Sequence, residues 1–167
     1  MEEIKIAGKN IFLKTPDIKE YRAFKRKYIP DPISDPKPFV YKEEEIDAEY
    51  EKLDADSEWN RILGIFTRQG EIIGIMIFKR IVFSEKRSDY EIILANETYR
   101  DRGVGTEATI LSSVFAKDTL GLTRVYSEVP ENNVRMAKML EKSGFSITKK
   151  RKDFKGNVFN LFVKRYD

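Results

Sequence analysis

The sequence contains no cysteine and no histidine among its 167 residues. The absence of cysteine excludes disulfide bonds, thiolate catalysis and cysteine-ligated metal sites. The absence of histidine removes the commonest metal ligand and the commonest general base. We therefore expect no metal centre, and any acid–base chemistry must use Glu, Asp, Tyr or Lys side chains.

Long apolar runs are also missing. No stretch approaches the roughly 18 apolar residues that span a bilayer, and residues 1–9 are charged and alternating, unlike a signal peptide. We expect a cytoplasmic protein that does not enter a membrane. The net charge of +3, from 31 Lys and Arg against 28 Asp and Glu, is too small to indicate nucleic acid as the main partner.

The composition that remains is typical of a packed core. Hydrophobic residues make up 41% of the chain and aromatic residues 12%, which is the profile of a globular fold. The length fits one domain of ordinary size. Since the sequence shows no linker, repeat or low-complexity segment, we expect a single domain over residues 1–167.

The hydrophobic pattern alternates between strand and helix periods along the chain. Strands are predicted at 10–15, 61–66, 71–78, 89–95, 123–129, 145–150 and 158–163, and helices at 15–27, 42–54, 103–117 and 132–142. The first helix is expected to begin at a Thr15 cap with Pro16 in its first position. Residues 28–38 hold four of the six prolines, so they are expected to form a loop. This order predicts an α+β or mixed α/β fold around one twisted sheet.

The clearest functional signal is the glycine segment Arg100-Asp-Arg-Gly-Val-Gly-Thr106, between a predicted strand and a predicted helix. Gly103 and Gly105 let backbone amides approach a ligand without a Cβ in the way. The start of a helix adds unpaired donors and partial positive charge, which suit a pyrophosphate. A flexible turn into a helix explains two glycines equally well.

A dinucleotide site is the alternative for the same glycines. The stretch from Gly103 to Ala108 fits G-x-G-x-x-A, and Glu128 ends the next strand where a ribose-binding acid would lie. Against this, the polar residues 96–102 separate the strand from the glycines, and too little chain follows to complete a doubly wound sheet. A Walker-type loop is excluded because no Gly-Lys-Ser/Thr occurs.

Two motifs resemble the GNAT superfamily of N-acetyltransferases. Arg100-x-x-Gly103-x-Gly105 is similar to its acetyl-CoA signature, and residues 133–145, ending Leu-Glu-Lys-Ser-Gly-Phe, resemble its second signature. The start at residues 11–18 and the Tyr90-Glu-Ile segment are similar to the branch with ribosomal-protein N-terminal and spermidine acetyltransferases. The resemblance implies a mostly antiparallel sheet flanked by helices. It also implies transfer of an acetyl group from acetyl-CoA to a primary amine of a protein N-terminus, polyamine or other small molecule.

The resemblance implies that main-chain groups hold acetyl-CoA. The amides of residues 102–106 would bind the pyrophosphate, and a splayed strand end at Ile93 and Leu94 would pair with the pantetheine arm, to which Asn133 would also bond. Basic side chains could add charge-assisted contacts to the phosphates, although each is equally well read as solvated. The donor site predicted in this way comprises Ile93, Leu94, Arg100, Arg102, Gly103, Val104, Gly105, Thr106, Asn133 and Lys142.

Glu91 is the predicted catalytic residue. It is a charge inside the apolar run from Tyr90 to Leu94, and partial burial there would favour its taking the proton of an incoming ammonium. A carboxylate on the solvent face of a strand is the structural alternative. Many relatives carry a Tyr as general acid in the second signature, but here that position is Leu140, so Tyr126 or water would have to replace it.

The acceptor leaves only faint signals. The helix over 42–56 carries many carboxylates, which either attract a polycation or form a solvated helix face: Glu43, Glu44, Glu45, Asp47, Glu49, Glu51, Asp54 and Asp56. A basic cluster at 149–152 with Lys155 fits an anionic group or a hairpin tip in water. Two other functions stay open: an acyl-CoA-binding module without catalysis, and a nucleic-acid-binding domain. A homodimer is also left open.

Overall fold

One sheet organises the described residues, 4–53 and 58–167, of a computed structural model. It has eight strands in the order β1-β2-β3-β4-β5-β6-β8-β7 within these ranges. Their bounds are β1 Lys5–Ala7, β2 Ile11–Lys14, β3 Arg61–Thr67, β4 Ile72–Val82, β5 Arg87–Leu94, β6 Arg124–Pro130, β7 Ser146–Lys152 and β8 Val158–Arg165. Neighbouring strands pair antiparallel except β5 and β6, which pair in parallel. The predicted α+β class, with a mostly antiparallel sheet, is confirmed.

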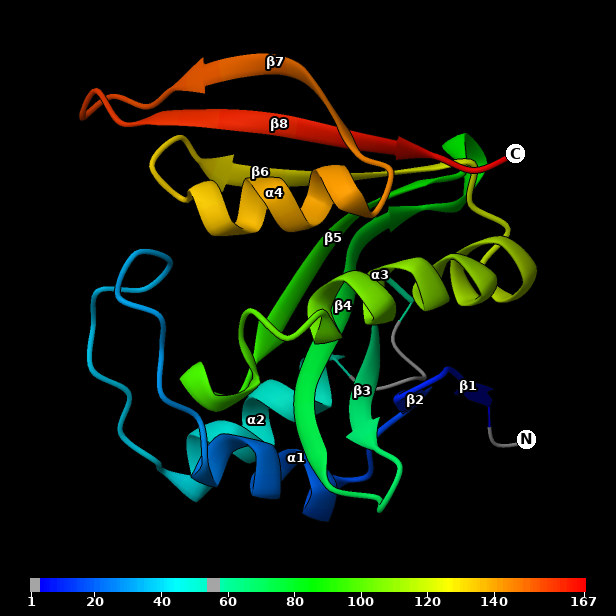
Figure 1. Cartoon of the computed structure of the whole chain (residues 1–167), viewed down its shortest axis with the longest axis vertical. Coiled ribbons are helices and arrows are strands. Elements are labelled where there is room, and N and C mark those ends of the chain that lie inside the picture. The colour runs from blue at the N-terminus through cyan, green and yellow to red at the C-terminus, as the bar shows by residue number, and fades with distance from the viewer. Residues whose placement is uncertain (1–3, 54–57) are drawn as a thin grey trace.

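Helices cover both faces of the sheet (Figure 1). Their bounds are α1 Ile18–Arg26, α2 Glu43–Leu53, α3 Val104–Val114 and α4 Val134–Lys142. Short 3-10 helices lie at η1 Phe83–Glu85 and η2 Glu97–Tyr99, and a π-helix, η3 Phe115–Thr119, follows α3. One core lies between the sheet and α3 and α4, and a second lies under α1 and α2. Strand β4 contributes Met76 to the first core and Ile75 to the second. This double burial explains why its sequence is continuously apolar.

Two local features differ from the predictions. Strand β1 was not predicted, because three residues at a sheet edge leave too short a pattern to recognise. Helix α1 is capped by Asp17 and not by Thr15. The Asp17 carboxylate accepts a hydrogen bond from the Glu20 amide at 2.8 Å, and the Glu20 carboxylate accepts one from the Asp17 amide at 3.0 Å. This reciprocal pair is a capping box, which satisfies two amides where a Thr15 cap would satisfy one.

The dinucleotide alternative is wrong. A doubly wound site needs a parallel sheet around the glycine turn, whereas β5 has β4 antiparallel on one side and only a short parallel contact with β6 on the other in the described chain. Glu128, the predicted ribose acid, instead receives two hydrogen bonds from Arg151, which lower the pKa of the Glu128 carboxyl.

The described residues contain neither a membrane-spanning helix nor a group of metal ligands. None of the helices in residues 4–53 and 58–167 is long and apolar enough to cross a bilayer. The same residues bring together no group of three or more Asp or Glu side chains suited to a metal ion.

The capping box makes a prediction about stability. Asp17→Ala should lower the free energy of unfolding by about 1 kcal/mol, because it leaves the first amides of α1 without an acceptor. Thr15→Ala is the matched control and should change it by less than about 0.5 kcal/mol. Urea unfolding followed by circular dichroism measures both. Equal losses in the two variants would contradict the assignment of the cap to Asp17.

Candidate active site

A cleft opens where β5 and β6 separate. The two strands pair only through Arg87–Asp89 and Arg124–Tyr126 as far as the described residues show. Beyond this point β5 continues beside β4 and β6 beside β8, and the two strands visibly diverge (Figure 1). A cavity of about 1150 Å³ lies at the divergence, and Tyr90–Leu94 line it. The end of β5 thus faces the cavity with backbone groups that β6 does not bond.

The glycine loop supplies the second wall. Gly103 caps α3 with a left-handed backbone, at a φ of 78°, and provides no side chain to bond the helix amides. The first bond inside the helix runs from the Glu107 amide to the Gly103 carbonyl at 3.0 Å. In the described part of the chain, the amides of Val104, Gly105 and Thr106 meet no acceptor. An anion at this end of α3 would find free donors and the positive end of the helix dipole.

Most of the predicted donor residues lie along this cavity. Those that line it are Ile93, Leu94, Arg100, Gly103, Gly105, Thr106, Asn133 and Lys142. Arg102 is exposed outside the lining, and Val104 packs against the core beneath α3. The side-chain contact of Arg102 to a phosphate therefore stays a prediction, and the partly buried side chain of Val104 leaves a main-chain contact at that position.

Helix packing gives a structural reason for a glycine at position 105. A Cβ at this position would lie 3.3 Å from Cγ of Met139 on α4, which is tighter than an ordinary contact. The second glycine of the motif therefore lets α3 and α4 approach each other, and this approach carries the basic face of α4 toward the free amides.

Lys142 and Lys138 form that basic face. They lie one turn apart on α4, and both line the cavity. Neither has an acidic partner within ion-pair distance among residues 4–53 and 58–167. Lys138 was not predicted, since the sequence does not distinguish it from a solvated lysine. An unpaired lysine beside free amides favours a multiply charged anion.

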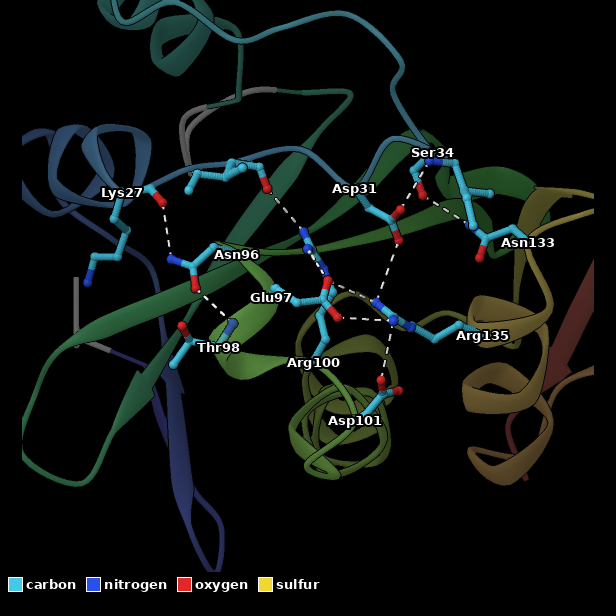
Figure 2. A network of polar contacts seen from close by, with 12 residues as sticks. Lys27, Asp31, Ser34, Asn96, Glu97, Thr98, Arg100, Asp101, Asn133 and Arg135 are labelled. Carbon is cyan, nitrogen blue, oxygen red and sulfur yellow. Dashed lines mark hydrogen bonds and ion pairs between the residues drawn. The ribbon is translucent and has the colours of Figure 1, made fainter.

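The loop between α1 and α2, residues 28–42 and here called the strap, crosses to this site, and Figure 2 shows its contacts. Arg100 donates to the Ile29 carbonyl at 3.2 Å and to Glu97 at 3.0 Å, and its side chain is only 10% exposed. Arg100 therefore braces the strap against η2. The predicted role of Arg100 at a phosphate requires these bonds to be shared or broken.

Asn133 is similarly occupied. It is 3% exposed, accepts a hydrogen bond from the Met136 amide at 3.2 Å as the N-cap of α4, and donates to the Ser34 hydroxyl at 2.9 Å (Figure 2). One side chain thus caps α4 and holds the strap. Its predicted bond to a pantetheine arm competes with Ser34.

Glu91 projects into the cavity from β5, but not into apolar surroundings. Its side chain is 41% exposed and forms an ion pair with Lys79 of β4. Tyr126 also lines the cavity and its hydroxyl accepts from Arg124 at 3.0 Å. The predicted base and the substitute acid therefore both reach the cavity.

A family comparison identifies the fold that carries this cleft. The model of the acetyltransferase (GNAT) domain family matches residues 11–146. The chain belongs to the GNAT acetyltransferase family. It is accordingly an acyltransferase, which agrees with the enzyme class predicted from the two signatures.

Solved GNAT structures superpose on nearly the whole chain. A spermidine N-acetyltransferase SpeG chimera from Vibrio cholerae and hSSAT has a TM-score of 0.78 at 15% identity, covering 94% of this chain and 96% of that one. The ribosomal L7/L12 α-N-protein acetyltransferase RimL gives 0.79 at 13%, covering 99% and 96%. The microcin C7 self-immunity acetyltransferase MccE, solved with acetyl-CoA and AMP, gives 0.74 at 18%, covering 95% and 94%. A search of curated proteins gives no significant match.

The position of the usual GNAT tyrosine has a clear structural role here. Leu140 is fully buried in the core between the sheet and α4. A side chain at this position, in this structure, does not reach the cavity lining. Tyr90 does line the cavity, but its hydroxyl is 2.8 Å from the Thr109 hydroxyl, and burial raises the pKa of Tyr90.

Residues that sequence reasoning missed close the other end of this GNAT cleft. Lys25 of α1 is 7% exposed, and its ammonium lies 2.8 Å from the Glu49 carboxylate of α2. Four rings surround it at 5.4 to 5.9 Å: Tyr21, Phe24, Tyr28 and Phe39. Burial, and secondarily the charge of Asp35, raises the pKa of Tyr28. The helical spacing of the aromatic residues was the available signal, but it indicates only a core face.

The two charged clusters noted in the sequence are paired in part. On α2, Asp47 bonds Arg22 at 2.7 Å, while Asp54 and Asp56 lie outside the described residues. In the basic hairpin, Lys150 pairs with Glu131 at 3.0 Å, and residues 149–152 do not line the cavity. Both patterns therefore fit surface charge that is partly paired, although Glu49 of α2 does reach the cavity.

The two bonds of Asn133 predict a graded loss of stability. Asn133→Ala should lower the free energy of unfolding by about 1 to 2 kcal/mol, because α4 loses its cap and the strap loses a bond. Ser34→Ala should cost less, since it removes the strap bond and keeps the cap. Urea unfolding measures both variants, and a larger loss in Ser34→Ala would contradict the capping role.

Proposed function

We propose that this enzyme transfers the acetyl group of acetyl-CoA to a primary amine by direct attack of the amine on the thioester. The observation that carries the proposal is the set of free amides at the start of α3, next to Lys138 and Lys142 and at one end of the cleft that leads to Glu91. A neutral donor would not need this concentration of positive charge. A pyrophosphate could accept hydrogen bonds from the amides and ion pairs from the lysines.

The residues present fit acetyl-CoA along the length of the cleft. The amides of residues 104–106 would hold the pyrophosphate, and the β5 edge at Ile93 and Leu94 would pair with the amides of the pantetheine arm. When bound, acetyl-CoA supplies an activated acyl group. The chain's contribution is to hold that group beside the acceptor, and such positioning is a major source of rate acceleration.

Glu91 is proposed to take the proton of the acceptor. An amine with an ordinary pKa arrives as ammonium and must lose a proton before it can attack. Glu91 lines the cleft on β5, in the apolar run that ends at the proposed pantetheine contacts. Lys79 already occupies this carboxylate, so an incoming ammonium has to replace or share the Lys79 contact.

A cationic amine is the proposed acceptor class. The far end of the cleft holds the carboxylates Glu49 and Glu91 and the ring faces of Tyr28 and Phe39, which are groups that bind ammonium ions. Lys25 and Lys79 already contact these groups, so an acceptor would have to share or displace their ammonium groups. The structural neighbours are described as acting on spermidine and on ribosomal L7/L12, two acceptors that carry amines. The choice between a polyamine and a protein N-terminus is left to experiment.

Retention of acyl-CoA without transfer is the second candidate. It is favoured by the burial of Leu140 where relatives carry an acid, and by the ion pair on Glu91. The two candidates differ in turnover. We would titrate the protein with acetyl-CoA beside NAD and NADP, and then follow thiol release with spermidine and with a peptide that has a free N-terminus. Donor binding without release of thiol for any amine would favour the second candidate.

The donor site is tested by placing a charge at the start of α3. Thr106→Glu should weaken acetyl-CoA binding roughly tenfold or more, because a carboxylate at the free amides repels the pyrophosphate. Glutamate is favoured in the first turn of a helix, so the fold should be kept. Thr106→Gln is the matched neutral control. Calorimetric affinities that are equal for the two variants would place the pyrophosphate elsewhere.

The base is tested by Glu91→Gln. This change should keep acetyl-CoA affinity and slow transfer by about 10² to 10⁴, because the acceptor ammonium loses its proton acceptor. Asp89→Asn is the matched control, since Asp89 lies two residues earlier on the same strand and pairs with Arg80 at 2.6 Å. A wild-type rate in Glu91→Gln would return Glu91 to a structural role.

A further inference from the structure

Arg135 joins three segments that meet at the donor end of the cleft. It lies in the first turn of α4, and its guanidinium bonds both carboxylate oxygens of Glu97 in η2, at 3.0 and 3.3 Å. The same group is 3.3 Å from Asp101 in the glycine loop and 3.8 Å from Asp31 in the strap. Figure 2 shows it between the three carboxylates. A single side chain thus connects α4, the loop before α3 and the strap.

Asp101 is the partner nearest to the free amides of α3. It has a left-handed backbone, at a φ of 59°, two residues before Gly103 at 78°. These two conformations turn the chain sharply into α3. Its carboxylate is 65% exposed, and Arg135 is the cation it contacts within the ranges 4–53 and 58–167. Arg135 therefore contacts an acidic side chain that lies three residues before the first free amide of α3.

The carboxylates around Arg135 outnumber the guanidinium groups even when Arg135 is present, and its removal would widen the difference. Three carboxylates, Asp31, Glu97 and Asp101, face two guanidinium groups, those of Arg135 and Arg100. Hydrogen bonds from Arg135, and then from Arg100, lower the pKa of the Glu97 carboxyl, so Glu97 remains ionised. Removing Arg135 would leave these carboxylates beside a site that has to accept another anion.

We propose that Arg135 is a positioning residue for the acetyl donor: it fixes the loop at 96–103 against α4 and the strap, and it neutralises Asp101 beside the amides of α3. Because its guanidinium is engaged by the three carboxylates, it acts through them and not by a reaction step. The inference rests on the proposed function, in which acetyl-CoA binds at this loop. It adds a residue that neither signature motif assigned to donor binding.

Replacing Arg135 tests the proposal. Arg135→Ala should weaken acetyl-CoA binding about tenfold and raise the KM for acetyl-CoA by a similar factor, while kcat at saturating donor stays near the wild-type value. Arg135→Lys keeps the charge but loses the two-pronged bond to Glu97, so its loss should be smaller. Circular dichroism and thermal unfolding check that each variant is folded. If Arg135→Ala does not fold, the affinity of Arg135→Lys is compared with that of the wild type instead.

Two comparisons separate positioning from general destabilisation. S-acetylpantetheine is a donor without the pyrophosphate, so its kcat/KM should be the same in Arg135→Ala and in the wild type. Adding Asp101→Asn to Arg135→Ala should recover part of the affinity for acetyl-CoA, because the uncompensated charge is gone and Asn tolerates the left-handed backbone. Arg87→Ala is the matched control: Arg87 pairs with Glu85 outside the cavity lining, and its loss should leave donor affinity unchanged.

The outcomes are distinct. Unchanged acetyl-CoA affinity in folded Arg135→Ala, or equal losses with both donors, would overturn the positioning role and leave the proposed function standing. Absence of acetyl-CoA binding by the wild-type protein would instead contradict the proposed function, and the role of Arg135 with it. A loss confined to acetyl-CoA and relieved by Asp101→Asn supports the proposal.

Discussion

The divergence of β5 from β6 is the constraint on which the site depends. A sheet can admit a ligand between two strands only by giving up their hydrogen bonds, and here the parallel pairing ends at Asp89. The backbone groups of β5 beyond that point then need another partner, because unpaired buried groups are costly. The cavity, the α3 amides and the lysines of α4 all border this gap. A polar donor arm would satisfy the edge that the fold leaves open.

Helix packing sets the second part of the site. Gly103 supplies the left-handed turn into α3, and Gly105 supplies the close approach of Met139. The two glycines of one motif therefore answer different requirements, one of backbone conformation and one of interhelical distance. Because the second requirement is met, α4 packs against α3, and Lys138 and Lys142 line the same cavity as Gly105 and Thr106. The anion binding proposed for this helix end would thus depend on α4 as well as on the loop.

The sequence predicts those features of the site that depend on neighbouring residues, and it does not predict contacts between distant segments. The glycine turn, the start of α3 and the apolar pattern of β3 and β4 are local, and the structure has them where they were expected. The contacts of Arg135 and the enclosure of Lys25 join segments far apart in the chain, so no spacing reveals them. An exposed lysine such as Lys138 has no signature at all. For α1, the cap predicted at Thr15 was wrong, because the reciprocal bonds between Asp17 and Glu20 place it at Asp17.

The lack of a tyrosine at Leu140 matters less than the availability of Glu91. A thiol has a pKa of about 8.5, so a departing thiolate needs little protonation near neutral pH. A lysine-like amine, at about 10.4, is almost wholly protonated at pH 7, and reaching its neutral form costs about 4 to 5 kcal/mol. Proton removal is therefore the larger demand. In this cleft Lys79 forms an ion pair with the carboxylate proposed to meet that demand, so the ammonium of an acceptor would compete with that of Lys79 for Glu91.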